Sequence, residues 1–281
     1  MSSASILLIN LLTSSDNAQN GQTDLKPTKL KSVSINDVIT HMTVLSPRSK
    51  EEINLKLKNC LNVLRDDLQS IERVAKEITE DASRNGVKYF EVGVDPTKLI
   101  SEGEAGEAAL TSTDVLRAVL RGLKEGWEET GTKGSVVAQV ERGKTGEAGG
   151  AGGVLSLCQS LRPEGVVGLE LTCNETVINS QIAGDSGTVE SLLFSAEDIA
   201  FMAAAKEKKI RCSVQAGEFG PPEMVFQALE KLQADRIVFG YNVTEVSEGG
   251  REGGYGQKIC FCFVSMITLT FNEKKRSLDE L

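Results

Sequence analysis

Histidine is almost absent from this sequence. His41 is the only one among 281 residues. A zinc site made of three histidines, or of two histidines and a carboxylate, therefore cannot be built within one chain. His41 lies in the segment DVITHMTVL, and we expect it to have an ordinary structural role rather than to bind a metal or transfer protons.

Long apolar runs and a basic leader are also missing. No run reaches the roughly 18 apolar residues that a membrane-spanning helix needs. No basic residue precedes the apolar segment SILLINLL near the N-terminus, whereas a signal peptide usually begins with a positive region. The closing SLDEL resembles a retrieval signal of the endoplasmic reticulum, and without a signal peptide we interpret it as chance. We therefore expect a cytoplasmic protein that does not bind membranes.

The cysteines form no CxxC pair. Their scatter matches neither a disulfide framework nor a zinc ribbon, so reduced thiols of a cytosolic protein are expected. The six are Cys60, Cys158, Cys173, Cys212, Cys260 and Cys262. Positive charge is in deficit as well, because the net charge is −9 and the isoelectric point about 5.0. Such a chain is repelled by nucleic acid and by anionic membrane surfaces, so neither is expected as a partner.

Apolar strands alternate with amphipathic helices along the middle of the chain. Strands are predicted at 87–94, 135–141, 165–172, 210–218 and 236–243, with a weaker candidate at 30–36. Helices are predicted at 50–84, 112–130, 154–162, 195–209 and 221–233, and Ser195 with Asp198 gives a capping-box pattern. This order predicts parallel β/α units, which form either a closed barrel or a doubly wound sheet. In both architectures function belongs to the loops after the strands.

The two ends of the chain differ from this middle region. Residues 1–28 form a leader that is polar and turn-rich over 13–28, residues 29–243 hold the β/α units, and residues 244–281 form a divergent tail. In the tail, a glycine-rich stretch precedes KICFCFVSMITLTF (258–271), whose β-branched and aromatic residues favour a strand. The tail is either genuine or the product of retained non-coding sequence or a shifted reading frame.

Two glycine-containing segments imitate nucleotide-binding loops. AQVERGKT (138–145) approaches the P-loop pattern, but its first half is predicted to be strand rather than phosphate-binding loop. GEAGGAGG (146–153) lacks the GxGxxG spacing, so a surface loop is expected there.

Four segments resemble the adenosine deaminase family, including its branch that acts on N6-methylated AMP. IERVAKEITEDASRNGVKYFEVGVDP is similar to a helix and the second barrel strand of that family, and EGVVGLELTCNE to the fourth strand. SVQAGE is similar to the fifth strand and DRIVFGYN to the sixth. The resemblance implies an α/β fold, a TIM-type (β/α)8 barrel that is incomplete here, with about six of the eight units. The seventh and eighth strands are not recognisable.

The resemblance also implies zinc-assisted hydrolysis, in which a zinc-bound hydroxide attacks the purine and a glutamate protonates the ring. Glu218 is retained at the position of that glutamate. The residues at the other positions differ from the family pattern. Ser32 and Ser34 occupy the places of an HxH pair, and Gln215 occupies that of the histidine in HAGE. Phe239 replaces the sixth-strand histidine, Cys173 a glycine and Gly93 an arginine. Hydroxyl and amide oxygens are poor zinc ligands compared with imidazole.

Two functions remain open at this point. The first is a non-catalytic relative without a cofactor, which binds a purine nucleoside or nucleotide, or a protein partner. The alternative is an active purine deaminase, acting on adenosine or N6-methyl-AMP, with zinc held by groups elsewhere in the chain.

Overall fold

The structure, a computed structural model, describes residues 61–101, 110–145, 151–173, 175, 194–218, 220–241 and 261–262. The leader 1–28, the candidate strand 30–36 with Ser32 and Ser34, His41 and most of the tail lie outside the described residues. What the sequence predicts for these segments stays a prediction.

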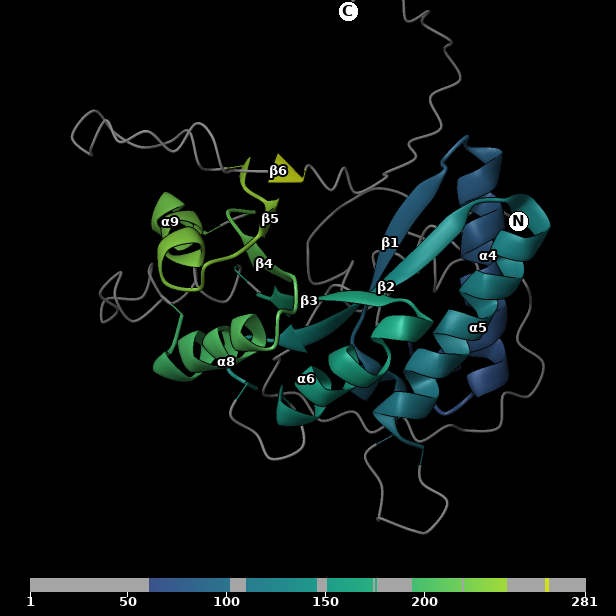
Figure 1. Ribbon diagram of the computed structural model, residues 1–281, viewed down its shortest axis with the longest axis horizontal. Helices are drawn as coiled ribbons and strands as arrows, with labels where there is room; N and C mark the ends of the chain where they lie inside the picture. The colour runs from purple at the N-terminus through teal and green to yellow at the C-terminus, as the bar shows by residue number, and fades with distance from the viewer. Residues whose placement is uncertain are drawn as a thin grey trace, which may run out of the picture.

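The described strands form one parallel sheet in the order β1-β2-β3-β4-β5-β6 (Figure 1). They are β1 (Tyr89–Val94), β2 (Lys133–Glu141), β3 (Val166–Thr172), β4 (Cys212–Ala216), β5 (Arg236–Phe239) and β6 (Phe261–Cys262). Each of the five strands predicted for the middle region is present. The strand predicted in the tail is confirmed for the two residues of β6, which pair with Ile237 and Val238.

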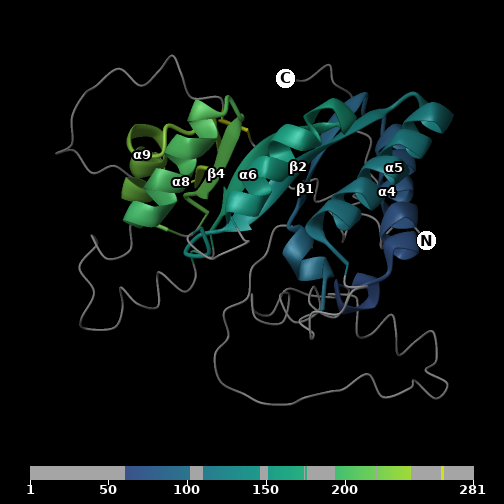
Figure 2. The same cartoon turned by 60° about the horizontal axis from the view of Figure 1, so that its bottom comes forward.

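Helices lie around the outside of this sheet (Figures 1 and 2). They are α4 (Leu68–Arg84), α5 (Ser112–Thr130), α6 (Ala151–Ser160), α8 (Ala196–Glu207) and α9 (Pro222–Glu230), with short 3-10 turns η1 (Pro96–Leu99) and η2 (Arg162–Glu164). The predicted capping box of Ser195 and Asp198 begins α8. Among these helices, none is both long and apolar enough to cross a membrane.

Two helix predictions need correction. The region 50–84 is not one helix, because Asp66 has φ = 61° and Asp67 caps a new helix, α4, by accepting a hydrogen bond from the Ser70 amide. Contacts with a distant segment hold this break, since the Asp66 amide donates to the Leu99 carbonyl at 3.0 Å. The loop predicted at 146–153 is also too long, because its residues 151–153 belong to α6.

The two faces of the sheet differ in polarity. Alternate residues such as Val92, Leu169 and Val214 face the helices and belong to one buried apolar core. Their neighbours along the strands carry polar side chains, among them the buried Gln139 and Glu170. Successive strand residues point to opposite sides, so the polar set occupies the face away from the helices.

An ion pair across the polar face shows how strongly the sheet curls. Arg236 at the start of β5 donates to the carboxylate of Glu91 on β1. These strands are four positions apart, which is about 19 Å in a flat sheet with a strand spacing of about 4.8 Å. Glutamate and arginine side chains cannot span that distance together. The described part of the sheet is therefore curved as in a barrel, and the expected incomplete (β/α) barrel is confirmed for these residues.

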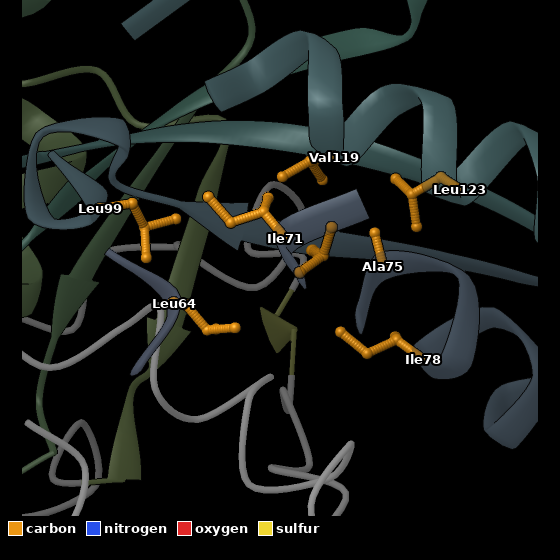
Figure 3. A pocket seen from close by; sticks show the side chains of 8 residues that line it. Leu64, Ile71, Ala75, Ile78, Leu99, Val119 and Leu123 are labelled. Carbon is orange, nitrogen blue, oxygen red and sulfur yellow. The ribbon is translucent and has the colours of Figure 1, made fainter. Parts of the chain in front are cut away.

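Helices α4 and α5 pack closely beside β1. Side chains from both helices and from β1 and η1 surround an apolar cavity of ≈ 20 Å³ (Figure 3). A cavity of this kind, without polar partners, does not hold water. It is a packing defect and not a ligand site. Its lining comprises Leu64, Ile71, Ala75, Ile78, Val92, Leu99, Val119 and Leu123.

Candidate functional site

The carboxyl ends of β3, β4 and β5 lie side by side, as the sequence predicts. The Cys173 amide, just after β3, donates to the side-chain oxygen of Gln215 on β4 at 3.3 Å. The Gly240 amide, just after β5, donates to the Ala216 carbonyl at 2.9 Å. The positions that the resemblance selects on these three strands therefore belong to one neighbourhood, which also includes the turn that carries Glu218.

Gln215 is held at both ends of its amide. Besides accepting from Cys173, it donates through Nε2 to Glu170 Oε1 at 2.9 Å. Gln139 Nε2 donates to the same Glu170 oxygen at 2.8 Å. Gln139, Glu170 and Gln215 thus form a hydrogen-bonded chain across β2, β3 and β4, the amide–carboxyl ladder. All three side chains are buried.

The ladder packs against Gly93 on the neighbouring strand β1, a residue without a side chain. A Cβ placed at Gly93 on β1 would lie 2.3 Å from Gln139 Nε2. Any larger residue at Gly93 would therefore displace Gln139 from Glu170. The glycine at this position, where the resemblance expects an arginine, gives Gln139 the room that it occupies.

Glu170 at the centre of the ladder is buried. Burial raises the pKa of its carboxyl above the ordinary value, and the hydrogen bonds from Gln139 and Gln215 offset part of that rise. Its hydrogen-bond partners among the described side chains are the neutral amides of Gln139 and Gln215. Its observed role is to connect three strands.

Cys173 lies buried at the end of β3, where the resemblance expects a glycine. Its thiol is 3.8 Å from Arg142 Nη1. Burial raises its pKa to about 11, although the nearby Arg142 acts in the opposite direction. The side chain is therefore a neutral thiol near pH 7, and the thiolate is the form that binds metals or attacks electrophiles.

Phe239 has a strained backbone. Its φ is 80°, in the left-handed region that a bulky residue rarely adopts. Its ring packs against Tyr241, with 5.9 Å between the ring centroids. A phenyl ring has no group that could transfer a proton, so Phe239 cannot take the chemical role of the histidine that the resemblance places there.

Glu218 lies in the turn after β4, half-buried. The buried carboxylate of Glu175 accepts hydrogen bonds from two amides of this turn, those of Gly217 and Gly220. The sequence reasoning did not single out Glu175, Gln139 or Glu170. A polar residue inside an apolar strand was the available signal for the last two, in SVVAQVE and GVVGLELT.

The described residues in this neighbourhood do not fit a zinc ion. Within the described ranges, no cluster of three or more histidine, cysteine, aspartate or glutamate residues could hold a metal. Gln215 uses its oxygen and its nitrogen inside the ladder, and Phe239 has no donor atom. Ser32 and Ser34 lie outside the described residues.

Two other features take no part in the ladder. A cavity of ≈ 250 Å³ opens at the opposite, amino-terminal end of the strands, beside Glu91, Ser213 and Arg236. Lys144, from the segment that imitates a P-loop, pairs with Glu141 at 3.0 Å, and β2 continues to Glu141 as predicted. The strand therefore occupies the place of a phosphate-binding loop.

Comparison with known proteins identifies the family. The family model described as adenosine deaminase matches residues 26–248. An adenosine deaminase of Xenopus laevis is 28% identical over 228 residues, which cover 77% of this chain and 58% of that protein. The chain thus spans little more than half the length of this relative.

Solved structures agree on the fold. The arabidopsis N6-mAMP deaminase superposes with a TM-score of 0.54 at 21% identity, over 74% of this chain and 56% of that one. An arabidopsis structure described as ADAL complexed with IMP gives a TM-score of 0.53 at 21% identity, with the same coverage of 74% and 56%. Because the family model covers well over half of the sequence, this chain belongs to the adenosine deaminase family.

Proposed function

We propose that this chain is a non-catalytic member of the adenosine deaminase family, which does not hold zinc and does not deaminate purines. The observation that carries the proposal is the amide–carboxyl ladder. In the ladder, Gln215 occupies the position that the resemblance gives to a metal-binding histidine, and its amide is hydrogen-bonded to Glu170 and to the Cys173 amide.

The energetics of the ladder oppose a return to metal binding. Turning the Gln215 oxygen toward a metal would break its bond with the Cys173 amide and disturb the donor to Glu170. A buried polar group left without a partner costs about 1–3 kcal/mol. A neutral amide oxygen is a weak zinc ligand and would not offset this cost, because zinc in proteins is bound by thiolate, imidazole and carboxylate.

A purine nucleoside or nucleotide is the ligand class that the family relationship suggests. The matched relatives are named for adenosine or N6-mAMP, and one solved neighbour is complexed with IMP. In this chain Glu218 lies at the carboxyl ends of the strands, where it could hydrogen-bond to a purine ring without any hydrolysis. The Cys173 side chain leaves a purine less room to approach the backbone at this end of the barrel.

The proposal is tested by assaying the full chain with adenosine and with N6-methyl-AMP, with and without added zinc. Release of ammonia or methylamine should equal that of buffer. Glu218→Gln is the matched control, because it removes the one retained carboxyl at the proton-donating position. Turnover by the wild type that Glu218→Gln abolishes would establish the alternative, an active deaminase with a relocated metal site.

Ligand binding is measured separately by calorimetric titration with IMP and adenosine. Binding without turnover is the expected result. If neither purine binds at millimolar concentration, the purine part of the proposal is wrong, and the loss of catalysis is still judged by the first assay.

A further inference from the structure

We infer that Glu175 is a positioning residue that holds the turn carrying Glu218 in place. The inference rests on the proposed location of the ligand site at Glu218. It extends that proposal by naming the residue on which the shape of this end of the barrel depends.

The contacts of Glu175 show an unusually specific fit. Its Oε1 accepts from the Gly217 amide at 2.6 Å and its Oε2 from the Gly220 amide at 2.7 Å. The residue is 1% exposed. Both oxygens of one buried carboxylate are therefore directed at the two amides that flank Glu218, and bonds of this charge-assisted kind are short and strong.

The turn is closely packed on both sides. Gly217 has φ = 77°, and a Cβ there would lie 2.7 Å from Val225 Cγ2. A Cβ at Gly220 would lie 2.6 Å from Met224 Sδ and 3.1 Å from Glu175 Cδ. The turn is thus packed between Glu175 on one side and helix α9 on the other.

The same turn is linked to the end of β5. A Cβ at Gly217 would approach the Gly240 Cα to 3.2 Å, and Gly240 follows the strained Phe239. Glu175 therefore connects the end of β3 with the turn after β4, and through that turn with the end of β5. Glu218 is carried by the part of the chain that these contacts fix.

Hydrogen exchange of individual amides tests this inference without any ligand. In Glu175→Gln, which keeps the size of the side chain, the Gly217 and Gly220 amides should exchange about 10- to 100-fold faster than in the wild type. Amides in β2 and β3 should be unaffected. The matched control is Glu141→Gln, which removes another buried carboxylate at the end of a strand and should leave both glycine amides protected.

Chemical rescue separates positioning from general loss of structure. In Glu175→Ala, adding acetate at constant ionic strength should slow exchange at Gly217 and Gly220 again, whereas chloride should not. Unchanged exchange at the two amides in Glu175→Gln, or equal effects of acetate and chloride in Glu175→Ala, would overturn the inference. These outcomes do not depend on purine binding, so a failure of the proposed function remains distinguishable.

Discussion

Gln215 stands where the resemblance places a metal-binding histidine, and in the structure its side chain connects neighbouring strands. The amide lies on β4 where an imidazole would face the metal, and its two ends are used by Glu170 and by the Cys173 amide. The substitution at Gly93 belongs to the same change, because it makes room for Gln139. Several departures from the family pattern are therefore parts of one buried network.

Gln215→His should not restore zinc binding. One imidazole does not make a tetrahedral site, Phe239 has no donor atom, and the described residues include no cluster of three or more histidine, cysteine, aspartate or glutamate side chains that could complete one. The variant should instead lose about 1–3 kcal/mol of unfolding free energy, because Glu170 and the Cys173 amide lose partners. Urea denaturation measures the loss and elemental analysis the metal. Stoichiometric zinc in this variant would show that a nearly complete site exists.

Glu170 should make stability depend on pH. Its pKa in the folded protein is raised, chiefly by burial, above the value of about 4.3 expected when unfolded. Its contribution is therefore fully present below the unfolded pKa and is lost as pH rises through the folded pKa. Glu170→Gln should remove this part of the dependence. Denaturant titrations of both proteins across a pH series give the comparison, and parallel curves would refute the assignment.

For the helices and strands, the periodicity of apolar residues predicted which elements exist and in what order they follow. It did not predict where each element begins and ends. The alternation of apolar strands and helices predicts β1 to β5, and the Ser195 and Asp198 pattern marks the start of α8. The break at Asp66 was not predictable, because it depends on a hydrogen bond to Leu99, a contact distant in sequence. The apolar stripe passes through that break without a change in spacing.

The contact between α4 and α5 leads to a prediction about helix glycines. A Cβ at Gly122 would lie 2.0 Å from the Glu72 carbonyl oxygen of α4. Gly122→Ala should therefore separate the helices and cost about 1–3 kcal/mol, as overpacking does. A Cβ at Gly153 on α6 would meet no atom of the described residues within 4 Å, so Gly153→Ala is the matched control.

In that control, alanine should be neutral or stabilise by up to about 1 kcal/mol, because it favours the helix more than glycine does. Thermal or urea denaturation of both variants gives the two free energies. If Gly122→Ala were as stable as Gly153→Ala, the helices would not be as closely packed as the structure shows.

The whole molecule combines a fold that the sequence predicts well with a site that it predicts only in part. Motif order predicted the barrel, and the ion pair between Glu91 and Arg236 demonstrates its curvature. The sequence also indicated Cys173, Gln215 and Phe239 as site positions, and the structure places them at the ends of neighbouring strands. Their partners were not indicated, because cross-strand contacts such as Gln139 with Glu170 depend on strand register, which no single segment specifies.

Zinc content distinguishes a non-catalytic chain from a zinc-dependent deaminase. The full chain, purified without chelators and dialysed against metal-free buffer, should contain well under one zinc ion per molecule by elemental analysis. This result is predicted because the described residues at the carboxyl ends of β3, β4 and β5 offer no set of zinc ligands. One tightly held zinc ion per chain would contradict the account and would support a deaminase whose metal is bound elsewhere.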